Sequence, residues 1–272
     1  MGVLGYNQKR PTAETYRRFR DELVKRLLTT DSRLTLMIYG SYVRQDYIPG
    51  RSDIDGLIIF HDDVIIDKTI YEFASNALSG ALKQHFVPFQ VSPCDLTTMR
   101  DGRFNSYNPH FKEYFAEEGR ILLGRDVREE FTYEIPTRDE QSALTFNLRK
   151  SRQGLLFSKY LLDTNNYEEF LRRFMATLDA TSRATKQVFH MNGNHALPNR
   201  FSALEELTAQ YPALDLKIIK EIKHLYHHLD ELDALYKKPQ EILRMWNEAV
   251  TFFETLIREY LRKNPKTTTS TS

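Results

Sequence analysis

Two acidic residues, Asp53 and Asp55, stand two positions apart at the start of an apolar run that continues to Phe60. In an extended strand, side chains two positions apart project from the same face, so both carboxylates lie side by side while Ile54 faces the core. Neighbouring carboxylates repel each other unless a cation lies between them. Magnesium, which prefers oxygen ligands and substrate phosphates, is the expected ion. The alternative, a solvated pair on an edge strand, fits the apolar residues 57–60 poorly.

A glycine and a serine, Gly40 and Ser41, directly follow an earlier apolar run, residues 34–39. Glycine lets the backbone turn tightly after a buried strand, and the serine can cap a short helix whose free N–H groups face an anion. The pair therefore suits a phosphate group. A simple turn with a helix cap explains the same two residues equally well.

The elements that must position these residues follow from the hydrophobic periodicity. Apolar residues recur at three- and four-residue steps over Thr12–Leu28 and again over Asp67–His85, which predicts two amphipathic helices. The two apolar runs, residues 34–39 and 54–60, predict buried strands. A third strand is expected over Phe86–Val91, at an edge or a bulge because it contains Pro88.

The second half of the sequence has helical periodicity almost throughout, from Thr137 to Lys263. The spacings Thr137–Glu140 and Ser202–Glu205 are typical of capping boxes, in which two side chains satisfy the first free N–H groups of a helix. Pro239 suits the first turn of a last long helix.

The sequence thus predicts an α+β chain in two domains. We expect a small mixed-sheet domain over residues 1–130, a helical bundle over residues 131–263, and a disordered tail over residues 264–272.

The composition limits the class of protein. With 41% apolar residues the chain can bury a core, which excludes a wholly disordered protein. Its 38 basic and 37 acidic residues give a net charge of +1, too balanced for binding nucleic acid mainly through the overall field. A single cysteine, Cys94, excludes an intrachain disulfide framework. No apolar run approaches the roughly 18 residues of a membrane span, and residues 1–10 lack the apolar segment of a secretion signal, so we expect a soluble, cytoplasmic protein.

The combined pattern resembles that of the DNA polymerase β-like nucleotidyltransferase superfamily. Its signature is Gly-Ser after one strand and Asp-x-Asp on the next, here Gly40-Ser41 and Asp53-Ile54-Asp55. The form found here is most similar to the antibiotic (kanamycin or aminoglycoside type) and small nucleotidyltransferases. The resemblance covers residues 34–95.

The resemblance implies a magnesium-dependent transferase that moves AMP, or another nucleoside monophosphate, from a triphosphate to a hydroxyl acceptor and releases pyrophosphate. Asp53 and Asp55 would be the catalytic metal ligands, and ATP the expected co-substrate. A small-molecule acceptor is expected, with a protein or a tRNA as open alternatives. The residues that would contact the nucleotide are Gly40, Ser41, Arg44 and Ser52.

The sequence departs from the family pattern at a third carboxylate, which the family places on the next strand. Gln90 stands there, and Asp95 reaches the metals only if a bulge shifts the register. A related branch uses a glutamate on the first bundle helix as general base. Glu140 and Asp139 are candidates, but a capping role explains Glu140 more economically, and the base stays unassigned. The rival hypothesis is a nucleotide-binding regulatory module without turnover.

Two further groups of residues have alternative interpretations. His224, His227 and His228 share a helix face and suit a transition metal, but the interspersed lysines at 217, 220 and 223 favour a solvated face. The basic runs 149–152 and 172–173 fit either a surface for an acidic acceptor or tRNA, or exposed helix faces.

Overall fold

The computed structural model describes residues 10–28, 33–102, 105, 107, 111–133, 138–193 and 199–265. The chain divides into two compact units, Met1–Pro136 and Thr137–Ser272, and each is described by itself. The Thr137 capping box lies outside the described residues, as does the expected tail from residue 266 onward. In the part of the chain that the structure describes, none of the helices has the length and hydrophobicity of a membrane span.

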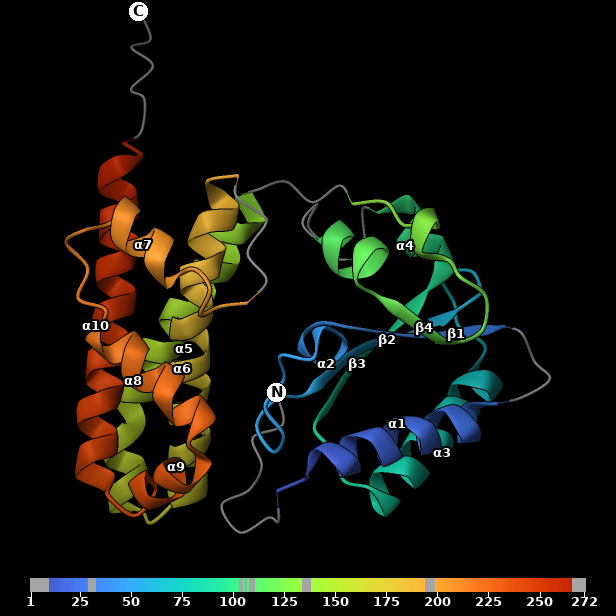
Figure 1. Cartoon of the computed structure of the whole chain (residues 1–272), viewed down its shortest axis with the longest axis horizontal. Coiled ribbons are helices and arrows are strands. Elements are labelled where there is room, and N and C mark those ends of the chain that lie inside the picture. The colour runs from blue at the N-terminus through green and yellow to red at the C-terminus, as the bar shows by residue number, and fades with distance from the viewer. Residues whose placement is uncertain are drawn as a thin grey trace, which may run out of the picture. The chain divides into compact units, whose positions relative to one another are not determined.

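The N-terminal unit contains a four-stranded mixed sheet in the order β3-β2-β1-β4 (Figure 1). Its strands are β1 (Leu34–Tyr39), β2 (Ile54–Phe60), β3 (Phe89–Asp95) and β4 (Arg120–Leu123). Strand β1 is antiparallel to both β2 and β4, whereas β2 and β3 are parallel. Together with the helical second unit, this sheet confirms the predicted α+β class.

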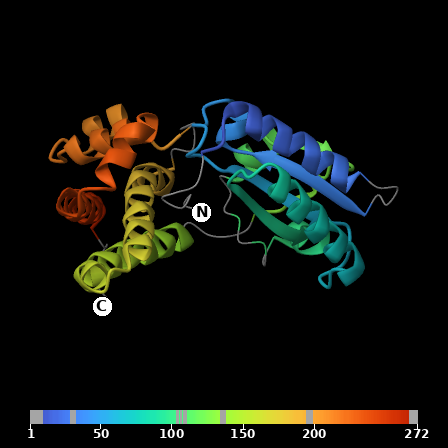
Figure 2. The same ribbon diagram turned by 90° about the horizontal axis from the view of Figure 1, so that it is seen from below.

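Helices cover both faces of the sheet. Helices α1 (Ala13–Leu27) and α3 (Lys68–Gln84) lie side by side on one face, as Figures 1 and 2 show, close to the ranges that periodicity predicts. The other face is covered by α4 (Leu96–Asp101), by the short π-helix η1 (Glu113–Glu117), and by Val127 and Phe131 on either side of the 3₁₀ helix η2 (Arg128–Glu130). Alternate residues of each central strand therefore enter two separate cores.

The third strand differs from its prediction. It begins after Pro88, at Phe89, and continues through Pro93 to Asp95. In the sheet, β3 lies at the edge beside β2, which is the position where a strand tolerates proline. The edge position predicted from Pro88 is confirmed, and the range was placed too early in the chain.

The described residues of the C-terminal unit form helices and the turns between them (Figure 1). These helices are α5 (Arg138–Asp163), α6 (Tyr167–Met191), α7 (Leu204–Gln210), α8 (Lys217–His227), α9 (Leu229–Leu235) and α10 (Pro239–Lys263). The long helices α5, α6 and α10 pack around the fully buried Trp246, whose ring contacts Phe170 and Phe174. A side chain at Gly154 would lie 2.8 Å from this ring, so glycine allows α5 and α10 to approach closely.

Two predicted helix starts can be compared with the structure. Pro239 lies in the first turn of α10, as predicted. The prediction that Ser202 caps a helix is wrong, because α7 begins at Leu204 with Ala203 as its N-cap residue. Asn199 Oδ1 accepts bonds from the backbone N–H groups of Phe201 and Ser202, so a separate turn precedes α7.

Candidate active site

The turn after β1 depends on the backbone freedom of glycine. Gly40 has φ +77° and ψ −156°, a conformation that residues with a side chain rarely adopt. Its carbonyl accepts hydrogen bonds from the N–H groups of Val43 and Arg44 at 3.0 and 3.1 Å, which starts the short helix α2 (Ser41–Arg44). The prediction that Ser41 caps this helix is wrong, because Gly40 is the N-cap residue and, among the described residues, no side chain caps the helix. Gln45, with φ +66°, ends it. Strand β1 is thereby followed at once by a compact turn.

The carboxylate of Asp55 lies directly against this turn. The β1–β2 register pairs Asp55 with Tyr39, the residue before Gly40. A Cβ atom added to Gly40 would lie only 2.6 Å from Asp55 Oδ2. Ile54 is buried in the core beneath α1 and α3, so Asp55 projects from the opposite face, as the two-residue spacing predicts. Glycine at position 40 therefore gives the carboxylate its space.

Asp53 precedes β2 and carries a buried oxygen that lacks a hydrogen-bond partner. Among the described residues, nothing donates to its Oδ2 atom. Burial raises the pKa of the Tyr39 hydroxyl above its ordinary range, and the negative charges of Asp55 and then Asp53 raise it further. Both carboxylates therefore act on one hydroxyl group. An unpartnered buried carboxylate oxygen beside a second carboxylate fits a divalent cation with oxygen ligands.

The strand position expected for a third carboxylate carries the amide side chain of Gln90 instead. The parallel β2–β3 register pairs Asp55 with Gln90, whose side chain is exposed. Asp95 pairs instead with Phe60, at the other end of β3, and no bulge shifts the register. The Asp95 carboxylate caps α4 by accepting bonds from the Thr98 N–H and hydroxyl, each at 2.7 Å. Asp95 is therefore a helix cap, and Gln90 is the neighbour of Asp55.

Ser52 has a structural role in the approach to Asp53. Its hydroxyl oxygen accepts a bond from the Ile48 N–H at 2.9 Å, and its own N–H donates to the Ile48 carbonyl at 2.8 Å. Its carbonyl accepts from the hydroxyl of the buried Tyr16 in α1. These bonds hold the loop that precedes Asp53 and β2 in place. Ser52 therefore positions Asp53 through the backbone of this loop.

Arg44 is paired with an acidic residue from a distant part of the chain. Its Nη1 atom lies 3.0 Å from both carboxylate oxygens of Glu118, and its Nε atom lies 3.4 Å from Asp46 Oδ1. Since a guanidinium carries several N–H donors, Arg44 can keep Glu118 and still bind a phosphate oxygen. The pairing holds Arg44 behind the Gly40 turn.

Aromatic residues surround the carboxylates, and the motifs of the sequence did not predict them. The rings of Tyr39 and Tyr114 have centroids 6.5 Å apart, and Phe115 contacts Tyr39 edge-on at 4.9 Å. Burial raises the pKa of Tyr114 to about 12, and the charge of Asp55 is among the smaller causes. The place of Tyr39 directly before Gly40 indicates that it lies near the site. Tyr114 is far from Tyr39 in the sequence, and only the folded chain brings the two rings together.

The comparison with known families bears on this sheet and its turn. None of the curated proteins matches the chain at a significant level. Residues 17–122 match the family model of the nucleotidyltransferase domain. The matched segment extends from α1 into β4 and includes the Gly40 turn and both carboxylates. The resemblance is confirmed at this level, and the narrower likeness to kanamycin-type enzymes stays a prediction.

The candidate residues of the second unit lack comparable support. Glu140 is buried in α5, and the side chain of Asp139 lies outside the described residues, so the general base stays unassigned. In the basic runs, Arg172 and Arg173 both pair with Glu169, at 2.5 and 2.7 Å. Pairing of this kind along a helix favours exposed helix faces over a binding surface.

Proposed function

We propose that this protein transfers a nucleoside monophosphate, with AMP the leading choice, from a magnesium-bound triphosphate to a hydroxyl acceptor. The observation that carries the proposal is the unpartnered, buried Oδ2 atom of Asp53 beside Asp55, whose carboxylate lies against the Gly40 turn. The nucleotidyltransferase family match over these residues supports the reaction class.

Each group of residues has its own role in the proposed reaction. Asp53 and Asp55 would hold the cation, and the Gly40-Ser41 turn would seat the triphosphate where no side chain blocks it. A bound magnesium ion neutralises phosphate charge and stabilises in-line displacement at the α-phosphorus. A bond forms between the acceptor oxygen and the α-phosphorus, the bond to the β-phosphate oxygen breaks, and pyrophosphate leaves. The acceptor proton passes to a base that we leave unassigned.

The finer features of the proposal rest on the sequence. ATP as co-substrate and a small-molecule acceptor are supported by the resemblance to small nucleotidyltransferases, and a cytoplasmic setting by the single Cys94. Gln90 beside Asp55 supports a second candidate, a nucleotide-binding module with weak or no turnover, because an amide cannot supply the third negative charge.

The test is transfer of α-labelled nucleotide by the full chain with magnesium and a panel of acceptors. Asp53→Asn and Asp55→Asn should each abolish transfer and leave the fold intact, since each removes one charge from the cation site. Asp63→Asn, an exposed residue after the other end of β2, is the matched control and should keep full activity.

The outcomes separate the candidates. Unchanged turnover in both variants would refute the proposal. Triphosphate binding without pyrophosphate release across the panel would favour the regulatory module. Label that is lost on ribonuclease or protease treatment would identify RNA or protein as the acceptor and replace the small-molecule part of the proposal.

A further inference from the structure

Three side chains in the C-terminal unit bring metal-binding atoms together where α8 gives way to α9. His224 lies in the last turn of α8, His228 connects the two helices, and Glu231 lies in the first turn of α9. One ligand atom from each lies within 4.8 Å of the other two. Of the three histidines in the sequence pattern, only two belong to this cluster, and a carboxylate that the pattern did not include completes it.

The local backbone explains the arrangement. The His228 N–H donates to the His224 carbonyl at 2.9 Å, so the two residues lie one helical turn apart. Their rings stack with centroids 4.0 Å apart. The His228 carbonyl then accepts from the Glu231 N–H at 3.1 Å, which begins α9 and brings the glutamate back towards the rings. His224 Nε2 lies 2.9 Å from Glu231 Oε2, and His228 Nδ1 lies 4.0 Å from Glu231 Oε1.

We propose that His224, His228 and Glu231 form a binding site for a divalent transition metal, with zinc as the best match. Two imidazoles and one carboxylate are a ligand set that zinc accepts. Zinc bonds of about 2.0–2.1 Å in a tetrahedron place ligand atoms about 3.3 Å apart, so small rotations of these exposed side chains close the site. Zinc would replace the bond between His224 Nε2 and Glu231 Oε2 and draw in His228 Nδ1, which already lies 4.0 Å from Glu231 Oε1.

The surroundings indicate what would complete the coordination. Three protein ligands leave one position of a tetrahedral zinc ion for water or another group. His224 and Glu231 also line a cavity of about 680 Å³, whose wall includes Lys217, Lys220 and Lys238. The same wall also carries Glu221, Glu241 and Arg244, so its charges are mixed and water is the expected fourth ligand. All three ligands belong to the second unit, Thr137–Ser272, and the metal proposal does not depend on the proposed function.

The test is zinc titration of the full, untagged chain against a chromophoric chelator. The chain carries Asp53→Asn and Asp55→Asn, so that the other carboxylate pair does not compete for the ion. We expect one zinc ion per chain. Removing a residue that merely supports a metal ligand costs about 10- to 100-fold in affinity, so His224→Asn, His228→Asn or Glu231→Gln should weaken binding by about 100-fold or more.

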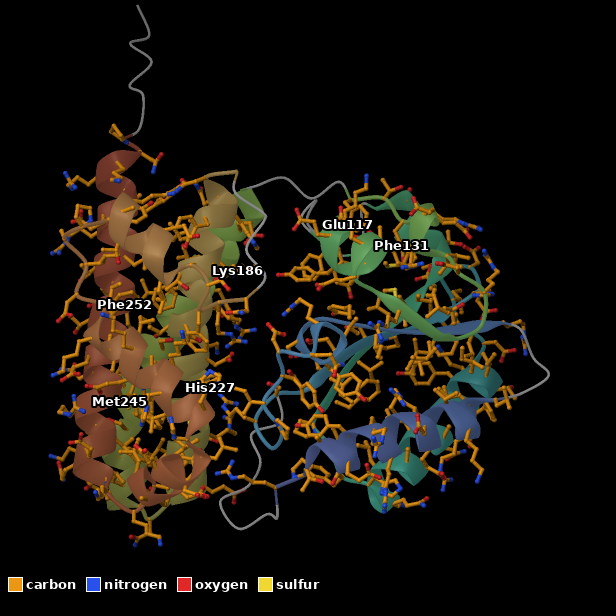
Figure 3. All side chains as sticks on the ribbon, viewed as in Figure 1. Glu117, Phe131, Lys186, His227, Met245 and Phe252 are labelled. Carbon is orange, nitrogen blue, oxygen red and sulfur yellow. The ribbon has the colours of Figure 1, made fainter. Side chains whose placement is uncertain are left out.

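His227→Asn is the matched control, because His227 ends α8 beside the cluster and is labelled in Figure 3. It should bind zinc as tightly as the parent chain. Circular dichroism checks that each variant keeps its helices, as expected for exposed positions. Absence of zinc binding, or an equal loss in His227→Asn, would overturn the proposal. Retained affinity in both His228→Asn and Glu231→Gln would do the same.

Discussion

The close contact between Gly40 and Asp55 allows a quantitative prediction of how a side chain at position 40 would lower the transfer rate. An alanine there must adopt φ +77°, which costs about 1–3 kcal/mol of stability. Its Cβ would also lie 2.6 Å from Asp55 Oδ2, where ordinary contact begins at 3.4 Å, so the carboxylate must retreat by about 0.8 Å. Misplacing a catalytic group by about 1 Å costs about 100-fold in rate. We therefore expect Gly40→Ala to lower kcat about 100-fold.

The assay measures initial rates of labelled nucleotide transfer, with urea unfolding to follow stability. Gly193→Ala separates backbone strain from collision, because Gly193 has φ +79° with nothing within 4 Å of an added Cβ. It should lose a similar amount of stability and keep full activity. If Gly40→Ala transfers nucleotide at the rate of the parent chain, Asp55 does not have the catalytic position assigned to it.

Two further predictions concern charge. Gln90→Glu places a third carboxylate beside Asp55 and should tighten magnesium binding about tenfold, measured as the magnesium dependence of the transfer rate; no change would exclude Gln90 from the metal site. The bonds from Arg172 and then Arg173 hold the pKa of Glu169 at about 2, below its ordinary 4.5. A lowered folded-state pKa stabilises the fold above about pH 4.5, and this contribution is lost as the pH falls towards 2. The Tm difference between the parent chain and Glu169→Gln should therefore shrink over that range, and a constant difference would contradict the pairing.

The central strands were predictable because their signals are local. β1 and β2 are short apolar runs bounded by Gly40 and by polar turns, and the structure gives both the predicted bounds. β4 was missed because it has only four residues, begins with the exposed Arg120, and exists through pairing with β1. The displaced β3 shows that a proline inside a strand is tolerated once that strand lies at an edge.

The site was predictable only where spacing determines geometry. Asp53 and Asp55 share a face because of the period of a strand. The pairing of Arg44 with Glu118 joins residues 74 positions apart, and no local pattern predicts it. Glu231 likewise lies in the histidine cluster because α8 ends before His228 and α9 begins after it. The lysine-rich periodicity of residues 217–223 did not predict this break.

The central claim is that Asp53 and Asp55 bind a divalent cation against a triphosphate at the Gly40 turn. The most direct test is a crystal structure with a non-hydrolysable ATP analogue and manganese, whose anomalous signal locates the ion. The account predicts a manganese peak bonded to oxygens of both aspartates and to the triphosphate. A bound triphosphate with its metal elsewhere, or no nucleotide beside the turn at saturating concentration, would contradict it.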